Sequence, residues 1–575
     1  MNPISDYLVL VSSPFKQLLD VLSLNLSSNF GSGIALVVDD KKKLVGVVED
    51  SDLRKSLNLA KSDDLRITDV MRKDFIYVES SMNKNEVIES LFEQINLRGW
   101  ETNLPVKIIP IVEDGVPVAL LNLEEIQLAI SIKRDRFIVV GLGYVGLTLA
   151  LSFAQLGRQV WGIDSSIHKL KMLESGNSYI TEPGIEQILI KSIQNNFFVQ
   201  KDLTDLSSKK GIRNIFFICV GTPLTPDTKP DLSVIDETMS EILKIIKVGD
   251  SIVMRSTVPV GTGRKIVNRI QSELGWIAGS DFHYISAPER TAEGNALKEI
   301  RDLPQLIAGA TEACLLYGIG IFQKLSNSTI QLDTIESAEL VKIMGNAFRD
   351  YTFGFSNFLI DICQQNNLDI NLLIEASNQG YPRSVIPAPS PGVGGPCLTK
   401  DSYFLSDNDF KAAESPVLLA RKVNESAPIK ALDFILSKEE VRDLRTHDLL
   451  AIGLAFKGVP ETNDIRNSTA IDFISRISDS IKSISIWDSA VDLSTIDIGV
   501  NFSIYESNKS YSFLAILNNN PKNVEFCRSV AKNLDAPEII LYDPWRMIDP
   551  LNLNTSKKVN RIHYFSLSHY KNIII

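Results

Sequence analysis

The sequence has little cysteine, and its cysteines are too widely spaced to form the usual metal or disulfide sites. Five cysteines are spread over 575 residues, and no two of them form a CxxC pair. Structural zinc sites and disulfide-rich secreted domains rely on closely spaced cysteines. We therefore expect no metal site and no disulfide framework, and a reducing, cytoplasmic compartment fits this pattern best.

An excess of basic residues and a leader segment are missing as well. The formal net charge of −11 argues against nucleic acid as the main partner, because phosphate binding needs a basic surface. Residues 1–10 lack the basic region and the cleavage site of a signal peptide. One uncharged run, residues 137–156, is long enough to span a bilayer. Glycines interrupt this run, so we interpret it as a strand, a turn and a buried helix and expect no membrane partner.

Segments of different pattern follow one another along the chain, and the length suggests about four domains. Strand and helix patterns alternate, so the expected fold class is α/β: two Rossmann-like, doubly wound domains joined by a central helical segment, behind an N-terminal α+β module. The expected boundaries are 1–133 for the module, 134–325 for a dinucleotide domain, 326–428 for the helical domain and 429–575 for a second Rossmann-like domain.

The N-terminal module contains an internal repeat. Residues 35–53 and 109–126 both read as strand, turn, strand and helix start. The repeat resembles a tandem pair of CBS domains, a family that often binds adenine nucleotides. The resemblance implies a regulatory module with an adenine nucleotide as its partner. The alternative is a degenerate pair that serves packing or assembly.

The CBS resemblance is incomplete at the positions that would hold a nucleotide. The family places Ser or Thr after the second strand, and Asp three residues later to bind the ribose. Asp52 matches that Asp, whereas Glu49 replaces the hydroxyl residue, and the second copy has Asn122 and Glu125. A carboxylate repels a phosphate, which counts against nucleotide binding.

A glycine-rich turn follows the first strand of the second segment. Residues 136–146 read RFIVVGLGYVG, and the next strand, residues 159–164, ends at Asp164. Glycine permits the tight turn and a close approach to a pyrophosphate, which the N–H groups of the following helix can bind. Asp164 would accept from a ribose 2′-hydroxyl and repel a 2′-phosphate, so NAD is favoured over NADP. The expected cofactor contacts are Gly141, Gly143, Tyr144, Val145, Gly146 and Asp164.

Polar loops follow three further apolar strands, at residues 220–223, 255–262 and 286–294. Ligands of open parallel sheets bind at the carboxyl ends of the strands. We therefore expect Thr222 and Thr257 to face the cofactor. Glu289 and Glu293 should face the crevice. For any single loop, an ordinary turn between a strand and a helix is the alternative.

The helical segment contains a cysteine in a loop rich in glycine and proline. Residues 389–401 read PSPGVGGPCLTKD, so Lys400 and Asp401 follow Cys397 after two intervening residues. Glycine lets the backbone pass close to a ligand, proline restricts the loop, and a nearby cation favours the nucleophilic thiolate. The loop is expected to present sulfur to a substrate. The alternative is a surface turn with an incidental buried cysteine.

Upstream of this loop, polar residues share one face of an expected helix. Glu339, Lys342, Asn346 and Arg349 recur at i, i+3, i+7 and i+10. A solvated face is the usual explanation, but apolar neighbours leave little room for an exposed helix. Asn is a modest helix former, so its place here suggests a functional role.

The last segment repeats the α/β pattern without a glycine fingerprint. Residues 447–457 and 483–488 contain strands, and residues 461–468 lead into a helix. A second Rossmann-like unit is expected. No pattern assigns the basic, apolar-ended segment 557–575.

Taken in order, these motifs resemble the UDP-glucose/GDP-mannose dehydrogenase family. The match runs over residues 134–547, through GLGYVG, VGTP, STVPVGT, APERTAEG, a helical KxxxNxxR pattern, PGVGGPCLTKD, GLAFKG and ETNDIRNS. The resemblance implies an enzyme that oxidises the C6 alcohol of a UDP-sugar to a carboxylate with two NAD, for surface polysaccharide. It also implies that the last domain binds the UDP-sugar and that the chain forms a homodimer or a larger homo-oligomer.

The resemblance assigns catalytic roles to five residues. Cys397 would attack the aldehyde to give a thiohemiacetal, and a second hydride transfer would give a thioester that water hydrolyses. Lys342 and Asn346 would stabilise the oxyanion. Asp401 and Glu289 would orient or deprotonate the water.

The resemblance also assigns binding roles. Arg466 is expected at the cofactor and Lys457 at the substrate diphosphate, with Lys400 as a further candidate near the reacting atoms. The expected substrate contacts are Arg290, Glu293, Arg349, Arg383, Gly394 and Lys457.

Some positions are closer to the N-acetylhexosamine branch of this family. Arg290 stands where UDP-glucose enzymes carry an apolar residue, and residues 346–350 and 381–383 resemble UDP-N-acetylmannosamine dehydrogenases. Pro396 departs from the histidine that often precedes the cysteine in those enzymes. We favour UDP-N-acetyl-mannosamine or -glucosamine over UDP-glucose as substrate.

Two other function classes explain the motifs less well. A two-electron dehydrogenase for a hydroxy acid needs neither the cysteine loop nor a second α/β domain. A nucleotide-sensing protein on an inactive dehydrogenase scaffold does not need Cys397, Lys342, Asn346 and Asp401 together.

Overall fold

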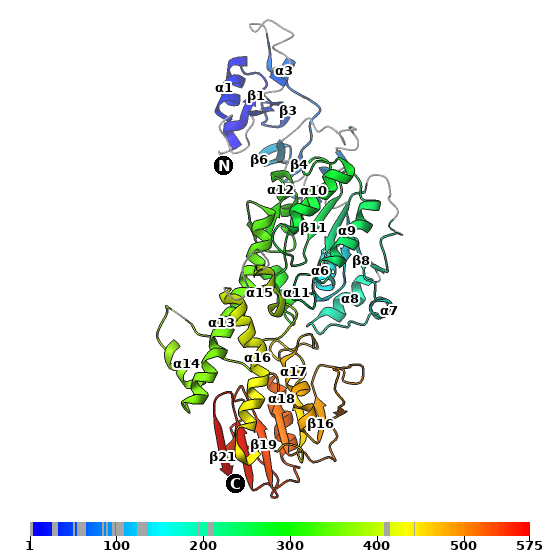
Figure 1. Ribbon diagram of the computed structural model, residues 1–575. Helices are drawn as coiled ribbons and strands as arrows, with labels where there is room; N and C mark the ends of the chain where they lie inside the picture. Colours follow the sequence, from blue (N-terminus) through cyan, green and yellow to red (C-terminus); the bar gives the residue numbers. More distant parts are fainter. Residues whose placement is uncertain are drawn as a thin grey trace. The chain divides into compact units, whose positions relative to one another are not determined.

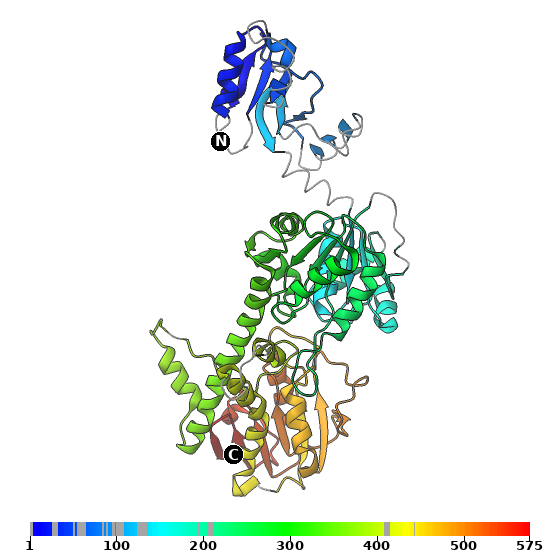
Figure 2. The same cartoon turned by 45° about the horizontal axis from the view of Figure 1, so that its top comes forward.

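The chain folds into two compact units, Met1–Arg134 and Asp135–Ile575 (Figures 1 and 2). The computed structural model describes residues 4–25, 33–49, 52–53, 65–82, 86–87, 90–91, 93–94, 98, 108–122, 135–193, 195–204, 206, 212–383, 385–406, 415–441 and 443–575. Each unit has its own sheets and its own hydrophobic core.

The first unit contains two small sheets that share one pairing pattern. Its described elements are η1 (Ile4–Tyr7), β1 (Leu8–Leu10), α1 (Phe15–Asn25), β2 (Ile34–Val38), β3 (Leu44–Glu49), α3 (Ile67–Val70), β4 (Val78–Glu79), β5 (Ile108–Glu113) and β6 (Val116–Asn122). β1 lies parallel to β2, which pairs antiparallel with β3, and the same relation holds for β4, β5 and β6. This repeated topology confirms the predicted internal repeat.

An eight-stranded sheet forms the first half of the second unit. In spatial order its strands are β14 (Thr329–Gln331), β13 (Gln305–Gly309), β12 (His283–Ser286), β11 (Ser251–Met254), β10 (Asn214–Ile218), β7 (Arg136–Val140), β8 (Val160–Ile163) and β9 (Phe197–Gln200). Only β12 and β13 pair antiparallel. The order reverses between β7 and β10, and such a switch point is where open α/β sheets bind ligands. The predicted Rossmann-like fold is confirmed, and β14 lies beyond the boundary placed at residue 325.

Helices cover both faces of this sheet because successive strand side chains point to opposite faces. On one face Phe137 and Phe217 pack against Phe153, with ring centroids 4.7 and 5.1 Å away. On the other face Ile138 and Phe216 join a core with Met239 and Ile270. The helices are α6 (Tyr144–Gln155), α7 (Ile167–Glu174), α8 (Ile185–Ile193), α9 (Ser233–Ile245), α10 (Thr262–Leu274), α11 (Ala296–Asp302) and α12 (Glu312–Phe322). The uncharged run 137–156 thus forms β7, a turn and α6, as predicted.

Four helices link the two sheets of the second unit: α13 (Ile335–Gln365), α14 (Ile370–Asn378), α15 (Leu398–Ser406) and α16 (Pro416–Leu436). α13 and α16 pack closely because α13 has a glycine at the contact. A Cβ atom on Gly354 would lie 2.6 Å from the Cβ atom of Ala420. The region is helical, as predicted, and α16 extends past the boundary placed at residue 428.

The second sheet confirms the second Rossmann-like unit. Its spatial order is β17 (Ser503–Ile504), β16 (Ser483–Trp487), β15 (Asp448–Ile452), β18 (Phe513–Ile516), β19 (Glu538–Tyr542), β20 (Arg561–Phe565) and β21 (Tyr570–Ile574). Helices α17 (Thr469–Ile477) and α18 (Pro521–Ala531) cover it, with short 3₁₀ turns η3 (Glu439–Val441), η4 (Ser478–Ser480) and η5 (Pro550–Asn552). The segment 557–575, which the sequence left unassigned, supplies β20 and the antiparallel edge strand β21.

Within the described ranges, no helix combines the length and the apolar character that crossing a bilayer requires. Among the same residues, no group of three His, Cys, Asp or Glu side chains is arranged to hold a metal ion.

Two glycines of α13 should respond in opposite ways to the same substitution. Gly354→Ala would force the added methyl group into the backbone of Ala420, and such overpacking costs about 1–3 kcal/mol. A Cβ atom on Gly345 would meet nothing within 4 Å. Gly345→Ala should therefore raise the free energy of unfolding by about 1 kcal/mol, because alanine has the higher helix propensity. Urea unfolding of both variants measures the difference, and equal effects would contradict the close packing of α13 on α16.

Candidate active site

The turn between β7 and α6 has the shape that a dinucleotide needs. Gly141 has φ +90°, and a Cβ atom there would lie 2.9 Å from the backbone of Cys219. A Cβ atom on Gly146 would lie 1.8 Å from the carbonyl oxygen of Gly141, so this glycine lets the helix pack on the turn. A Cβ atom on Gly143, at the N-cap of α6, would meet nothing within 4 Å. The N-terminus of α6 is therefore open to an anion, and the residues present fit a pyrophosphate.

Asp164 lies at the carboxyl end of β8, beside this turn. It accepts hydrogen bonds from the backbone N–H groups of Leu142 and Ser166, both at 3.0 Å, and lies 3.2 Å from Lys169 Nζ. A carboxylate has about four acceptor positions. One position is left for a ribose hydroxyl, so the side chain fits its predicted role in binding NAD.

Loops that follow β10 and β11 meet the cysteine loop. Thr222 donates to the carbonyl oxygen of Thr257 at 2.7 Å. Lys400 Nζ lies 3.2 Å from Thr222 Oγ1 and 2.9 Å from Asp401 Oδ1. The structure therefore brings the dinucleotide domain and the cysteine loop together. We call the place where these loops and those of the second sheet meet the junction.

Cys397 stands at the start of α15 in the junction. Its carbonyl oxygen accepts from the N–H groups of Lys400 and Asp401 at 3.2 and 3.1 Å. It is exposed, whereas the other cysteines of the chain are buried. Although solvent reaches the side chain, the surrounding protein displaces much of the water near the thiol and raises its pKa. The ammonium groups of Lys342 and Lys400 lower the same pKa.

Polar residues of α13 face this cysteine loop. Asn346 donates from Nδ2 to Asp401 Oδ2 at 2.7 Å, and both side chains are buried. Lys342 is half-buried, and its charge acts on the pKa values of both Cys397 and Glu289. The helical spacing seen in the sequence therefore puts Lys342 and Asn346 on the face of α13 that meets the cysteine loop, where Asn346 contacts Asp401 of α15.

Glu289 is a buried carboxylate with a buried cation beside it. Arg255 donates to Glu289 Oε2, and the N–H groups of Arg290 and Thr291 donate to Oε1 at 2.7 and 3.0 Å. Burial alone would raise the pKa of Glu289, but Arg255 and the two N–H groups bring it below its usual range. Arg255 also donates to Gln305 Oε1 at 3.1 Å. Glu289 therefore stays ionised and fixed in direction.

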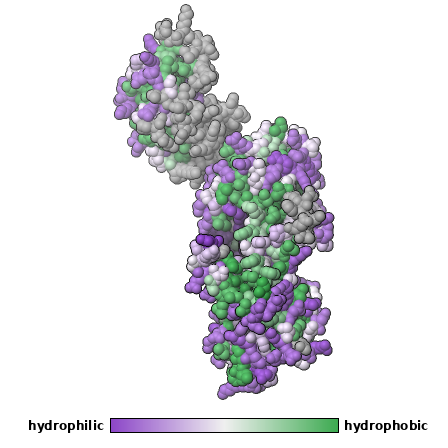
Figure 3. Space-filling model, turned by 60° about the vertical axis from the view of Figure 1, so that its left-hand side comes forward, coloured by the Kyte–Doolittle hydropathy of each residue, from purple (hydrophilic) through white to green (hydrophobic). Residues whose placement is uncertain are grey.

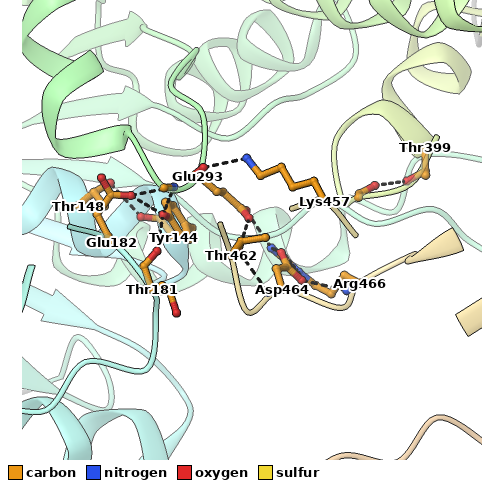
Figure 4. Close-up of polar contacts among 12 residues, drawn as sticks. Tyr144, Thr148, Thr181, Glu182, Glu293, Thr399, Lys457, Thr462, Asp464 and Arg466 are labelled. Atoms are coloured by element: carbon orange, nitrogen blue, oxygen red, sulfur yellow. Dashed lines mark hydrogen bonds and ion pairs between the residues drawn. The ribbon is translucent and has the colours of Figure 1, made fainter. Parts of the chain in front are cut away.

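Glu293 connects the first sheet of the second unit with the second (Figure 4). Lys457 Nζ donates to its carbonyl oxygen at 2.8 Å, and Arg466 Nη2 lies 3.4 Å from Oε1. Thr462 lies 3.5 Å from Oε2. Burial and the nearby carboxylate of Asp464 raise the pKa of Glu293 to about 7, although Arg466 and Lys457 lower it. The cations predicted at the substrate diphosphate and at the cofactor, Lys457 and Arg466, thus contact one acidic residue of the first sheet's loops.

The cysteine loop is packed against the loop before α17. A Cβ atom on Gly394 would lie 2.3 Å from the carbonyl oxygen of Asn467. The N–H group of Gly395 donates to the same oxygen at 3.1 Å, and Asn467 Nδ2 lies 2.9 Å from Thr399 Oγ1 (Figure 4). The absence of a side chain at Gly394 therefore allows the two loops to approach closely. Gly394 was predicted as a substrate contact, and this packing role was not predicted.

Three predicted arginines are less closely tied to the junction. Arg290 donates from its guanidinium to the carbonyl oxygen of Pro304. Arg349 is exposed on α13. Burial lowers the pKa of Lys457, and the positive charge of Arg349 lowers it further. Arg383 is exposed in the segment after α14, with its guanidinium carbon 5.8 Å from the ring centre of Tyr381. The substrate roles of these arginines stay predictions.

Two buried charged residues were missed by the sequence reading. Glu182 accepts from the N–H groups of Gly294 and Leu297 at 2.9 and 3.0 Å, and from the hydroxyl of Tyr144 (Figure 4). Arg255 holds Glu289 as described. The turn Glu-Pro-Gly at 182–184 was the available signal for Glu182, because an acidic residue at such a turn is placed to cap nearby N–H groups. Arg255 begins the polar loop at residues 255–262, in which the sequence assigned a role to Thr257 alone.

In the first unit, the carboxylate predicted to bind ribose already has protein partners. Asp52 Oδ2 accepts from the N–H group of Glu49 at 2.9 Å and lies 2.9 Å from Arg72 Nε. Arg72 also lies 3.3 Å from Glu49 Oε1. Glu125 and the side chain of Asn122 lie outside the described residues. An adenine nucleotide at this unit stays a prediction.

Comparison with known proteins identifies three segments of the chain. Residues 135–326 match the NAD binding domain of the UDP-glucose/GDP-mannose dehydrogenase family, and residues 336–426 match its central domain. Residues 10–59 match the CBS domain.

Individual relatives match over most of their own length. The UDP-N-acetyl-D-mannosamine dehydrogenase of Pyrococcus horikoshii is 32% identical over 356 residues, 61% of this chain and 83% of the relative. The NDP-N-acetyl-D-galactosaminuronic acid dehydrogenase of Ralstonia nicotianae is 30% identical over 355 residues, 60% of this chain and 81% of the relative. A solved UDP-D-ManNAc dehydrogenase structure from Pyrococcus horikoshii superposes with a TM-score of 0.65 at 28% identity, over 75% of this chain and 99% of that one.

The carboxyl group of Glu293 should make the stability of the protein depend on pH. Its pKa is raised from 4.5 to about 7 in the folded chain. Between these values the folded state binds more protons than the unfolded state, so this group lowers the free energy of unfolding as the pH rises. In Glu293→Gln that part of the pH dependence should disappear. Urea unfolding of both proteins across this range measures it, and identical pH profiles would contradict the raised pKa.

Proposed function

The chain belongs to the UDP-glucose/GDP-mannose dehydrogenase family of NAD-dependent oxidoreductases, and from this premise we propose that it oxidises the C6 hydroxyl group of a UDP-N-acetylhexosamine to a carboxylate. The observation that carries the proposal is the position of Cys397, beside Lys400, which also contacts Thr222 of the dinucleotide domain. A nucleophile at that place suits a second oxidation, from aldehyde to acid. The named relatives act on N-acetylated nucleotide sugars, which supports this substrate class over UDP-glucose.

Covalent capture of the aldehyde is the proposed role of Cys397. When bound, NAD accepts a hydride from the substrate, and oxidation of an alcohol to an acid uses two NAD. The thiolate attacks the C6 aldehyde and forms a carbon–sulfur bond, which gives a thiohemiacetal. Loss of the second hydride leaves a thioester. Water then breaks the carbon–sulfur bond, releases the carboxylate and returns the thiol.

The donors around the thiol are proposed to stabilise the negative charge that develops on the C6 oxygen. Lys342 and Asn346 lie on the helix face that meets the cysteine loop, and fixed donors need no reorganisation as the charge develops. Asp401 accepts from Asn346 and Lys400 at 2.7 and 2.9 Å. In this proposal Asp401 orients Asn346 and Lys400, so that both can donate to the substrate oxygen.

Glu289 is proposed to orient the water that hydrolyses the thioester. Its lowered pKa keeps it ionised at neutral pH, so it accepts a hydrogen bond from water more readily than it takes up a proton. Its fixed direction, set by Arg255, favours one water position. Neutral pH is the range in which this orientation operates.

The cations at Glu293 are proposed to bind phosphate groups. Lys457 would meet the diphosphate of the substrate and Arg466 the cofactor. Lys457 contacts the carbonyl oxygen of Glu293, and Arg466 contacts the carboxylates of Glu293 and Asp464. Charge-assisted bonds to phosphate are stronger than those to a neutral carbonyl, which favours the exchange of the carbonyl for phosphate at Lys457.

We also propose that two chains form a homodimer through an apolar stripe on α13. The side chains of the stripe are 39–66% exposed, and monomeric proteins rarely leave a contiguous apolar patch of this kind in water. In Figure 3 apolar residues gather along the middle of the second unit. The members recur at helical spacing: Leu340, Met344, Phe348, Tyr351, Phe355, Phe358 and Ile362.

The proposed reaction should consume two NAD for each sugar. Purified protein with NAD and a panel of UDP-sugars should form two NADH per molecule of UDP-N-acetyl-mannosamine or -glucosamine consumed, and a uronate as product. Cys397→Ser should abolish uronate formation while NAD binding is retained, because the glycine turn is untouched. Absorbance at the NADH band and mass spectrometry of the product give the ratio.

Iodoacetamide labelling provides the matched control for this experiment. Cys397 is the exposed cysteine of the chain, so the native protein should be alkylated there first and lose activity in parallel. A single NADH per sugar would show that the reaction stops at the aldehyde. Unchanged uronate formation in Cys397→Ser would refute the covalent step, and preference for UDP-glucose would favour the alternative substrate.

A charge on the apolar stripe should separate the proposed dimer. Phe348→Glu places a carboxylate on a side chain that is 66% exposed in one chain, and burying that charge in an interface would be costly. Ile277→Glu, at a position that is 62% exposed elsewhere on the unit, is the matched control. Light scattering after size-exclusion chromatography should give a monomer for the first variant and a dimer for the second. A wild-type monomer would refute the stripe as an interface.

A further inference from the structure

Beneath the cysteine loop lies a buried ion pair that the proposed chemistry does not use. Arg421 of α16 and Asp350 of α13 are 1% and 0% exposed, and Arg421 Nη1 lies 2.8 Å from Asp350 Oδ1. The same guanidinium reaches the loop at two points. Nη2 lies 2.8 Å from the carbonyl oxygen of Val393, and Nη1 lies 3.5 Å from that of Leu398. These two carbonyls stand on either side of Cys397 in the chain.

Neighbouring side chains fix Asp350 in its place. Asn424 donates to Asp350 Oδ1 at 2.7 Å, and Ser402 donates to Oδ2 at 2.9 Å. Asn424 accepts from Asn357 at 2.9 Å, and Asn357 accepts from the N–H group of Ser390 at 2.8 Å. Groups from α13, α15 and α16 therefore converge on this ion pair and, through it, on the loop backbone on both sides of Cys397.

The physical chemistry of such a pair favours positioning over stability as its purpose. Two charges lose hydration when they are buried, and a well-packed apolar pair of similar volume often holds the surrounding structure as firmly. A guanidinium offers something else, because its planar fork bonds several oxygens in fixed directions. The fork of Arg421 bonds Asp350 on one side and the loop backbone on the other.

We propose that Arg421 is a positioning residue for Cys397: it holds the carbonyls of Val393 and Leu398 and so fixes where the thiol stands relative to Lys342. The catalytic part of this inference rests on the proposed function. The fixing of the loop does not, because it concerns only contacts within the chain. Without the fork, the loop keeps its contacts with Asn467 but loses those on the α16 side.

The test uses variants that separate the fork from the charge. Arg421→Met alone would leave Asp350 buried and unpaired, which is strongly destabilising. The main variant is therefore Asp350→Asn/Arg421→Met, which removes both charges. Arg421→Lys keeps the charge without the fork. Lys422→Met, at an exposed position of the same helix, is the matched control.

Two measurements are made on the full chain. The first is deuterium exchange of the amides of residues 390–398 without ligands, and it needs no substrate. The second is turnover with NAD and UDP-N-acetyl-mannosamine or -glucosamine. It gives kcat, KM, and the share of aldehyde that a hydrazide traps in solution.

In the double variant we expect the loop amides to exchange at least about fivefold faster, because local opening costs less free energy. We expect kcat to fall by about tenfold to a hundredfold with KM nearly unchanged, since a small misplacement of a reacting group has effects of this size. Trapped aldehyde should rise because a displaced thiol captures it less efficiently. Arg421→Lys should lie between the double variant and wild type, and Lys422→Met should match wild type.

Two results would overturn the inference. One is loop exchange in the double variant equal to that of Lys422→Met. The other is a lower melting temperature with an unchanged share of trapped aldehyde, which would mean that Arg421 serves stability alone. If the wild type oxidises no UDP-sugar, the proposed function fails by itself, and deuterium exchange still decides whether Arg421 fixes the loop.

Discussion

One long helix fixes the relative positions of the groups that the active site needs. α13 has 31 residues, which corresponds to about 46 Å of helix. Near its start, Glu339 accepts from the N–H groups of Gly261 and Gly263 at the beginning of α10, each at 2.7 Å. Farther along, Asn346 meets the cysteine loop, and Asp350 meets α16. Because a helix is stiff over this length, α13 fixes the position of the thiol relative to the dinucleotide domain.

The charges at the junction explain how an acidic chain can bind an anionic substrate. The whole chain carries a net charge of −11, yet Lys342, Lys400, Lys457 and Arg466 gather where the loops meet. Carboxylates lie there too: Asp401 is paired with Lys400, and Glu293 and Asp464 are paired with Arg466. Glu289 is balanced by Arg255, which is 1% exposed. The local balance, and not the net charge, sets the potential that a nucleotide sugar meets.

The sequence predicted those parts of the site that depend on local backbone requirements. The glycines at 141 and 146 are needed by the turn and the helix contact themselves, and a run of motifs in order indicated the fold and the family. Contacts between distant segments could not be read in this way. Glu182 and Gly294 are 112 residues apart, and no periodicity or spacing connects them. The internal ion pair at Asp52 was hidden for the same reason, because Arg72 comes from another part of the module.

Each sheet of the second unit has an aspartate that accepts hydrogen bonds from backbone N–H groups, but the two aspartates differ in the acceptor positions left for a ligand. Asp164 and Asp488 both follow the strand next to the first strand of their sheet, and both accept from N–H groups of the turn after that first strand and of the residues just after the Asp itself. Asp488 accepts four such bonds, from Leu454 and Ala455 on one oxygen and from residues 490 and 491 on the other. A carboxylate with about four acceptor positions is then fully used, whereas Asp164 keeps one for a ligand. The second sheet therefore holds its turn with protein contacts alone, and the same turn continues into Lys457, which reaches Glu293 of the first sheet.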